Sequence, residues 1–102
     1  MFNINGIEWD IKLVSFNHPK VIRRDGSFAL GSCDNTTHTI YLTDIIPPIK
    51  LKKVLCHEIT HAAMFSYNVN MNLEQEELVA DLIATYGAEI IDVTNRIFSR
   101  IT

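Results

Sequence analysis

The clearest alternation of apolar and polar positions lies in the middle of the chain. The run from residue 51 to 65 contains no glycine or proline. Apolar or small residues recur there at spacings of 4, 3 and 4, namely Leu55, Ile59, Ala62 and Ser66. This spacing is typical of one face of an α-helix. Pro47 and Pro48 precede the run, and proline suits a first helical turn, where its missing N–H is not needed. The pattern predicts a helix from about residue 48 to 67.

A second helical pattern follows a short polar break. Its apolar residues again recur at spacings of 4, 3 and 4, namely Val79, Ile83, Tyr86 and Ile90. Asn72 is placed as the N-cap, and Gln75 stands where it completes a capping box. We expect a helix from about 73 to 90 or beyond, with the four apolar side chains as its buried stripe. Residues 91–101 stay amphipathic, which is compatible with a longer helix, docking on the sheet, or pairing with a second copy.

The first half of the chain shows the shorter period of a sheet. Residues 7–16 begin with alternating apolar and polar positions, which is typical of a half-buried strand. The side chains expected on its inner face are Trp9, Ile11 and Leu13. Residues 26–31 and 37–42 have the composition of two more strands, joined by the turn-forming Cys-Asp-Asn-Thr sequence. These patterns predict a β-meander followed by two long helices, in one α+β domain over residues 1–102.

Composition limits the class of protein. A net charge of −3 over 102 residues gives no support to nucleic-acid binding. No apolar run approaches the length of a membrane span, and the N-terminus lacks the basic-then-apolar order of a signal peptide. The two cysteines, Cys33 and Cys56, do not make a disulfide framework. We therefore expect a cytoplasmic protein that binds neither nucleic acid nor membranes.

The first predicted helix carries the sequence His57-Glu58-Ile59-Thr60-His61, an H-E-x-x-H motif. Residues four apart on a helix share one face, so both imidazoles can reach a single metal ion. Glu58 is then placed to contact a water molecule bound to that ion. The motif indicates zinc-assisted hydrolysis of an amide bond.

The second predicted helix offers carboxylates for the third ligand position that a catalytic zinc site requires. Glu77 and Asp81 are four residues apart and share a helix face. Glu77 is placed to bind the ion, and Asp81 can accept a hydrogen bond from the other ring nitrogen of a zinc-bound histidine. Glu76 is the rival ligand. The alternative for Glu77 and Asp81 is an ordinary charged helix start, and this is the preferred interpretation of Glu74, Gln75 and Glu76.

The two motifs together, H-E-x-x-H and E-x-x-A-D, resemble the pattern of gluzincin zinc metallopeptidases. Their short spacing is similar to that of minimal gluzincins and of the ImmA/IrrE-like peptidases of phages and mobile elements, over residues 38–90. The resemblance implies a zincin-like fold, in which a small antiparallel or mixed sheet precedes a metal-binding helix and a second ligand-bearing helix. It also implies that residues 39–42 form the edge strand beside the cleft. SprT-like proteins share the first motif, but they usually supply a third histidine, and none follows His61 here.

The same resemblance implies a role for each motif residue. His57, His61 and Glu77 would bind Zn²⁺. Glu58 would act as general base and acid, and Asp81 would orient a ligand histidine. The expected function is a zinc metalloendopeptidase that hydrolyses a protein or peptide substrate through a metal-activated water. Two alternatives stay open: a non-catalytic, metal-stabilised protein-interaction module of a phage or mobile element, and a structural protein whose zinc only stabilises a small core.

Other residues are candidates for supporting roles. Tyr41, Tyr67 and Tyr86 are candidate oxyanion donors, although each also fits an ordinary packed aromatic. His38 is a candidate for facing substrate, although a lone histidine there also fits a surface residue. Cys33 is a candidate latency ligand, because thiolates bind zinc. The small basic clusters are interpreted as solvated faces; they are Arg23, Arg24, Lys50, Lys52 and Lys53. The C-terminal residues 99–102 are candidates for blocking the cleft or for self-association.

Overall fold

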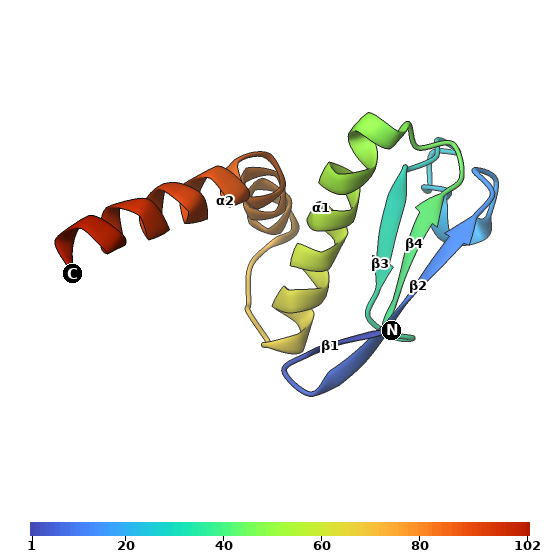
Figure 1. The fold of residues 1–102 in the computed structure, drawn as a ribbon. Helices are drawn as coiled ribbons and strands as arrows, with labels where there is room; N and C mark the ends of the chain where they lie inside the picture. Colours follow the sequence, from blue (N-terminus) through green and yellow to red (C-terminus); the bar gives the residue numbers. More distant parts are fainter.

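The computed structural model describes residues 1–102, and it has the α+β architecture that the sequence predicts (Figure 1). A four-stranded sheet and a short 3₁₀ helix come first, and two α-helices follow. The elements in chain order are β1 (Phe2–Ile4), β2 (Ile7–Val14), η1 (Pro19–Val21), β3 (Gly31–Asp34), β4 (Thr39–Thr43), α1 (Pro48–Ser66) and α2 (Leu73–Ile101). Neither helix has the length and apolar character needed to cross a membrane.

The sheet is mixed, and the predicted β-meander is wrong. The strand order is β1-β2-β4-β3, with β4 parallel to β2 and antiparallel to β3. The chain leaves β2 through a long connection that contains η1, so β3 does not pair with β2 as a hairpin partner would. As a result β4 is an interior strand and β3 lies at an edge, which contradicts the expectation that residues 39–42 form the edge strand.

The third strand also starts later than predicted. It begins at Gly31 and runs through Cys33 to Asp34, whereas residues 26–30 form a loop with one isolated bridge between Ile22 and Phe28. The Asp34 carboxylate accepts a hydrogen bond from the Thr36 backbone N–H at 2.8 Å. This local turn moves the reversal of the chain beyond Asp34, so that the cysteine belongs to the strand.

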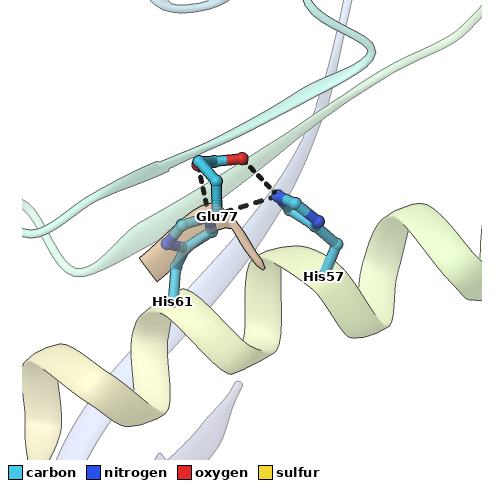
Figure 2. Close-up of side chains that lie close together, drawn as sticks. All are labelled: His57, His61 and Glu77. Carbon is cyan, nitrogen blue, oxygen red and sulfur yellow. Dashed lines mark hydrogen bonds and ion pairs between the residues drawn. The ribbon is translucent and has the colours of Figure 1, made fainter. Parts of the chain in front are cut away.

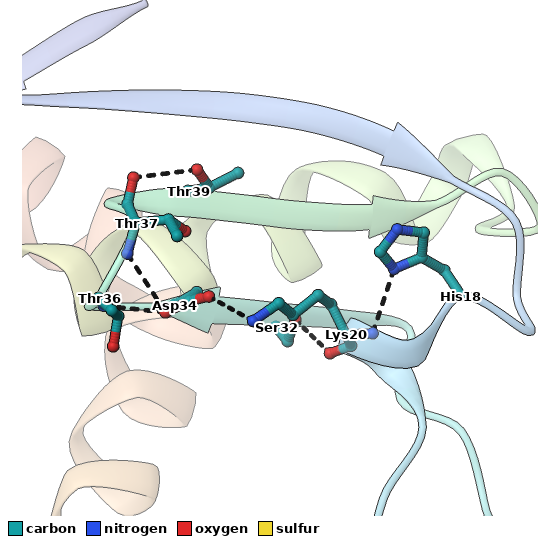
Figure 3. Close-up of polar contacts among 7 residues, drawn as sticks. All are labelled: His18, Lys20, Ser32, Asp34, Thr36, Thr37 and Thr39. Atoms are coloured by element: carbon teal, nitrogen blue, oxygen red, sulfur yellow. Dashed lines mark hydrogen bonds and ion pairs between the residues drawn. The ribbon is translucent and has the colours of Figure 1, made fainter.

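Polar contacts fasten η1 to strand β3 (Figure 3). The Lys20 ammonium lies 2.8 Å from Asp34 Oδ2, and the Ser32 hydroxyl donates to the Lys20 carbonyl at 2.8 Å. The Lys20 backbone N–H in turn donates to Nδ1 of His18. These bonds hold η1 beside the edge strand, where it forms one wall of the cavity described below.

The core lies between the sheet and α1. Trp9 and Ile40 are fully buried, and Leu42 and Ala62 pack with them. The Trp9 indole N–H donates to the Ser66 hydroxyl at 2.8 Å, which fixes the end of α1 against the first β-hairpin. Leu13, predicted on the inner face, is largely exposed, because α1 packs on β1, β3 and β4 and leaves the end of β2 uncovered.

Both helices match their predicted starts. Pro48 opens α1, and α2 begins with the Asn72–Gln75 capping box in which each side chain meets the other residue's backbone. Residues 91–101 continue α2 without interruption. The predicted buried stripe of α2 is wrong, because Ile83, Tyr86 and Ile90 are exposed and only Ala80 is fully buried. The first turns of α2 pack on α1, and the remainder projects away from the sheet (Figure 1).

Candidate metal centre

Helix α1 brings the two histidines of the H-E-x-x-H motif together. His57 and His61 are one turn apart, and their rings meet edge to face with centroids 4.9 Å apart. Their Nε2 atoms lie 3.1 Å from each other. The His61 ring is buried and the His57 ring is mostly buried. The helical spacing alone therefore aims two ring nitrogens at a common point.

Helix α2 supplies the third group at that point. The Glu77 carboxylate spans the two rings, with Oε1 2.9 Å from His61 Nε2 and Oε2 3.2 Å from His57 Nε2 (Figure 2). The capping box sets where α2 begins, and so it sets which residue of the first turns faces α1. The structure thus brings together the three residues that the sequence proposes as ligands, and their ligand atoms lie within 4.8 Å of one another.

Each histidine also contacts a carboxylate through its other ring nitrogen. His57 Nδ1 lies 2.9 Å from Asp81 Oδ1, the contact expected for Asp81. His61 Nδ1 lies 2.6 Å from Glu76 Oε1. In a metal site, a neutral histidine donates through the ring nitrogen that faces its carboxylate partner. With Asp81 and Glu76 as those partners, the Nε2 lone pairs would be directed toward Glu77 and free to bind an ion.

The contact made by Glu76 was missed from the sequence, where this residue was interpreted as a helix-start charge or a rival ligand. One available signal was numerical: two ligand histidines each require an orienting partner, and only Asp81 had been assigned. When α2 places Glu77 between the two rings, it also places Glu76 and Asp81 on opposite sides of the histidine pair. Glu76 reaches His61, and Asp81 reaches His57.

The donor set fits a small divalent cation. Two atoms bound at about 2.0–2.1 Å to one tetrahedral zinc ion lie about 3.3–3.4 Å apart. The separations among the three groups, 2.9, 3.1 and 3.2 Å, are only slightly shorter. Three lone-pair donors that face one point repel one another, and a cation between them would remove that repulsion. His57, His61 and Glu77 form a group that could hold a metal ion.

Glu58 lies beside this group without belonging to it. It is buried and lines the same cavity. Burial raises the pKa of its carboxyl group, and the positive charges that His57 and His61 can carry act in the opposite direction. A Cβ atom added at Gly31 would lie 3.2 Å from Glu58 Cγ. Strand β3 therefore approaches Glu58 as closely as it does because residue 31 has no side chain.

A cavity of about 660 Å³ opens over these residues, between η1, β3 and the two helices. Two cations line this cavity, Arg23 and Lys53, although their sequence pattern predicts solvated faces. Neither contacts a carboxylate, whereas Lys20 at the same cavity is paired with Asp34. Only tertiary structure could reveal this, because the two cations come from a loop and a helix thirty residues apart in the sequence.

The candidate oxyanion donors are not at the site. The cavity is lined by none of the three tyrosines, and His38, the candidate for facing substrate, does not line it either. Tyr41, which belongs to β4, stacks on His18, and His38 packs against Trp9. Tyr67 is exposed just after α1, and Tyr86 is exposed on α2.

Cys33 lines the cavity but is not one of the three converging groups. Burial and the nearby charges of Glu58 and Glu76 raise the pKa of its thiol to about 12. Without a metal ion the side chain is therefore a neutral thiol at neutral pH. Its absence from the converging group does not favour the latency role considered for it. Cys56 is also a free cysteine.

Comparison of the chain with protein-family models, with curated proteins and with solved structures finds no match.

Proposed function

We propose that this chain is a zinc-dependent metallopeptidase of the gluzincin type, with His57, His61 and Glu77 as the metal ligands. The observation that carries the proposal is the complete set of contacts around the two rings. Each Nδ1 is held by its own carboxylate, and both Nε2 atoms face Glu77. Catalytic zinc sites combine three protein ligands of this kind with a hydrogen-bond acceptor behind each histidine, which is often a carboxylate. The resemblance of the H-E-x-x-H and E-x-x-A-D motifs to gluzincins points the same way.

The chain's own residues then divide the chemistry among them. A zinc ion held by His57, His61 and Glu77 would supply Lewis acidity for activating water and polarising a carbonyl. Glu58 would act as the general base toward water and as the general acid toward the leaving amine. A buried carboxyl group with a raised pKa suits both halves of this task, because it holds a proton more readily than an exposed glutamate.

The surroundings of the site suit an extended peptide. Strand β3 has β4 on one side and no strand on the other, and its residues Gly31 to Cys33 line the cavity. Exposed strand edges bind extended segments through backbone hydrogen bonds. Arg23 and Lys53 would attract a negatively charged part of the substrate at the same cavity.

A second candidate is a non-catalytic, metal-stabilised interaction module. The observation that favours it is the set of exposed apolar side chains on α2 from Leu82 onward, none of which lines the cavity. A metal that only stabilises the fold does not require a buried carboxylate such as Glu58 beside it. The open cavity also favours catalysis, since structural zinc sites are closed.

Comparison of the unmodified chain with Glu58→Gln tests the proposal. Both proteins are loaded with zinc, and the assay follows cleavage of a denatured, fluorescently labelled protein. We expect the variant to keep one zinc ion per chain and to lose activity by about 10²- to 10⁴-fold, the usual contribution of a general base. Glu74→Gln, an exposed glutamate on the first turn of α2, serves as the matched control and should cleave normally.

The possible outcomes separate the two candidates. Equal cleavage by the unmodified chain and Glu58→Gln would overturn the role given to Glu58. Zinc binding without cleavage in either protein, over a panel of denatured substrates, would favour the interaction module.

A further inference from the structure

The second half of α2 carries a surface that the metal centre does not use. From Leu82 onward the helix has no buried residue, although many of its side chains are large and apolar. Five of them recur at spacings of 3, 4, 3 and 4, and we call these the α2 seam: Ile83, Tyr86, Ile90, Val93 and Ile97. A seven-residue apolar repeat of this kind is the pattern by which one helix packs along another.

The seam is hollowed and has charged flanks. A shallow groove runs along it, lined by Leu82, Tyr86, Glu89, Ile90, Val93 and Thr94. Glu89 and Arg96 are seven residues apart, so they lie on the same flank of the seam. The opposite flank carries Gly87 and Thr94, whose small side chains allow another helix to approach closely.

We propose that the α2 seam binds the α2 seam of a second copy of this chain, with the two helices antiparallel. If the crossing point lies midway between residues 90 and 93, Ile90 packs on Val93 of the partner subunit. Tyr86 then packs on Ile97 of the partner subunit. The same register sets Glu89 opposite Arg96 of the partner subunit, and the two-fold axis repeats this contact.

Charge decides the direction of pairing. In a parallel pair, each flanking residue faces the one five positions further along the other helix. Glu89 would then face Thr94 and Arg96 would face Ile101, so neither charge would meet its opposite. In the antiparallel register Glu89 of each copy faces Arg96 of the partner subunit, so the dimer holds two such ion pairs. Arg96 also lies 3.2 Å from Asp92 of its own helix, so each end of the interface would hold a cation with two carboxylates.

The same charges argue against a membrane as the occupant. Helices that lie on anionic membranes carry an excess of lysine and arginine beside the apolar face. The exposed half of α2 instead balances Glu89 and Asp92 against Arg96 and Arg100. The α2 seam lies away from the cavity residues, so the inference does not depend on zinc binding or on peptidase activity. The pairing would place the two sheets, and with them the two cavities, at opposite ends of the helix pair.

Sedimentation equilibrium of the full chain over a range of concentrations tests the pairing. We expect a dimer that dissociates on dilution. Ile90→Glu, at the centre of the seam, should raise the dissociation constant by roughly a hundredfold or more, because both copies lose a central apolar contact. Ile91→Glu is the matched control. It is the neighbouring isoleucine, is similarly exposed at 60% against 53%, and lies off the seam. It should leave the dissociation constant within a few-fold of the original.

Charge reversal tests the antiparallel register independently of the apolar contacts. Glu89→Arg should weaken the dimer, because the new arginine of each copy would lie opposite Arg96 of the partner subunit. The double variant Glu89→Arg with Arg96→Glu should recover most of the lost affinity. Circular dichroism of each variant confirms that α2 remains helical. A monomer at all concentrations would overturn the proposal, whether or not the chain then binds lipid vesicles. Equal weakening by Ile90→Glu and Ile91→Glu, or no recovery in the double variant, would overturn it as well.

Discussion

Replacement of Glu76 gives the sharpest measure of how the histidines are held. Its carboxylate lies 2.6 Å from His61 Nδ1, and both side chains are well shielded, at 15% and 8% exposure. A hydrogen bond to a charged group is worth about 1.5–3 kcal/mol, whereas a neutral one is worth about 1. Glu76→Gln keeps an acceptor and loses only the charge, so zinc affinity should fall about 5- to 10-fold. Glu76→Ala removes the acceptor, and the loss should approach about 100-fold.

Asp81 provides the internal comparison. It makes the equivalent contact to His57 at 2.9 Å, but its side chain is 65% exposed. Water competes for the bond and screens the charge, so Asp81→Asn should weaken zinc binding by no more than about threefold. Asp81→Asn and Glu76→Gln each remove one negative charge from a histidine partner. A difference in zinc affinity between them therefore reports the effect of burial.

Zinc affinity is measured by competition with a chromophoric chelator at neutral pH, with Glu74→Gln as the control for loss of charge alone. The expected order of affinity is unmodified chain, then Asp81→Asn, then Glu76→Gln, then Glu76→Ala. The reasoning is refuted if Glu76→Gln binds zinc as tightly as the unmodified chain, or if Asp81→Asn has the larger effect.

Two further predictions concern stability. Lys20 holds the pKa of Asp34 at about 2, below its ordinary 3.8, so the carboxylate stabilises the fold above pH 4 and this contribution is lost between about pH 4 and 2. Asp34→Asn should lower the free energy of unfolding by about 1 kcal/mol near pH 6 and should make it depend less on pH below 4. Urea titrations in which the variant and the unmodified chain show the same acid dependence would contradict this. Gly31→Ala should lower the free energy of unfolding by about 1–3 kcal/mol, because the added Cβ would lie 3.2 Å from both the Tyr41 carbonyl oxygen and the Glu58 side chain. An unchanged Tm would show that β3 can move away from α1 without cost.

Several features of this protein follow from neighbours in the sequence, and these could be predicted. The start of α2 at the Asn72–Gln75 capping box depends on residues three apart, and the alignment of His57 with His61 depends on residues four apart. Both are fixed once the segment is helical, because helix geometry relates such positions directly. The coarse α+β class follows for the same reason, since each element's period can be recognised within the element.

Tertiary structure decided the features that depend on distant segments. Strand β4 lies between β2 and β3, and no local pattern in residues 39–43 specifies those partners. The face of α2 that is buried is the one beside Ala80, because α1 contacts only the first turns of the longer helix. The apolar period predicted a buried stripe there, but periodicity identifies an apolar face and not what covers it. Glu76 likewise holds His61 only because two helices pack at one particular rotation, and the sequence of either helix alone does not specify that rotation.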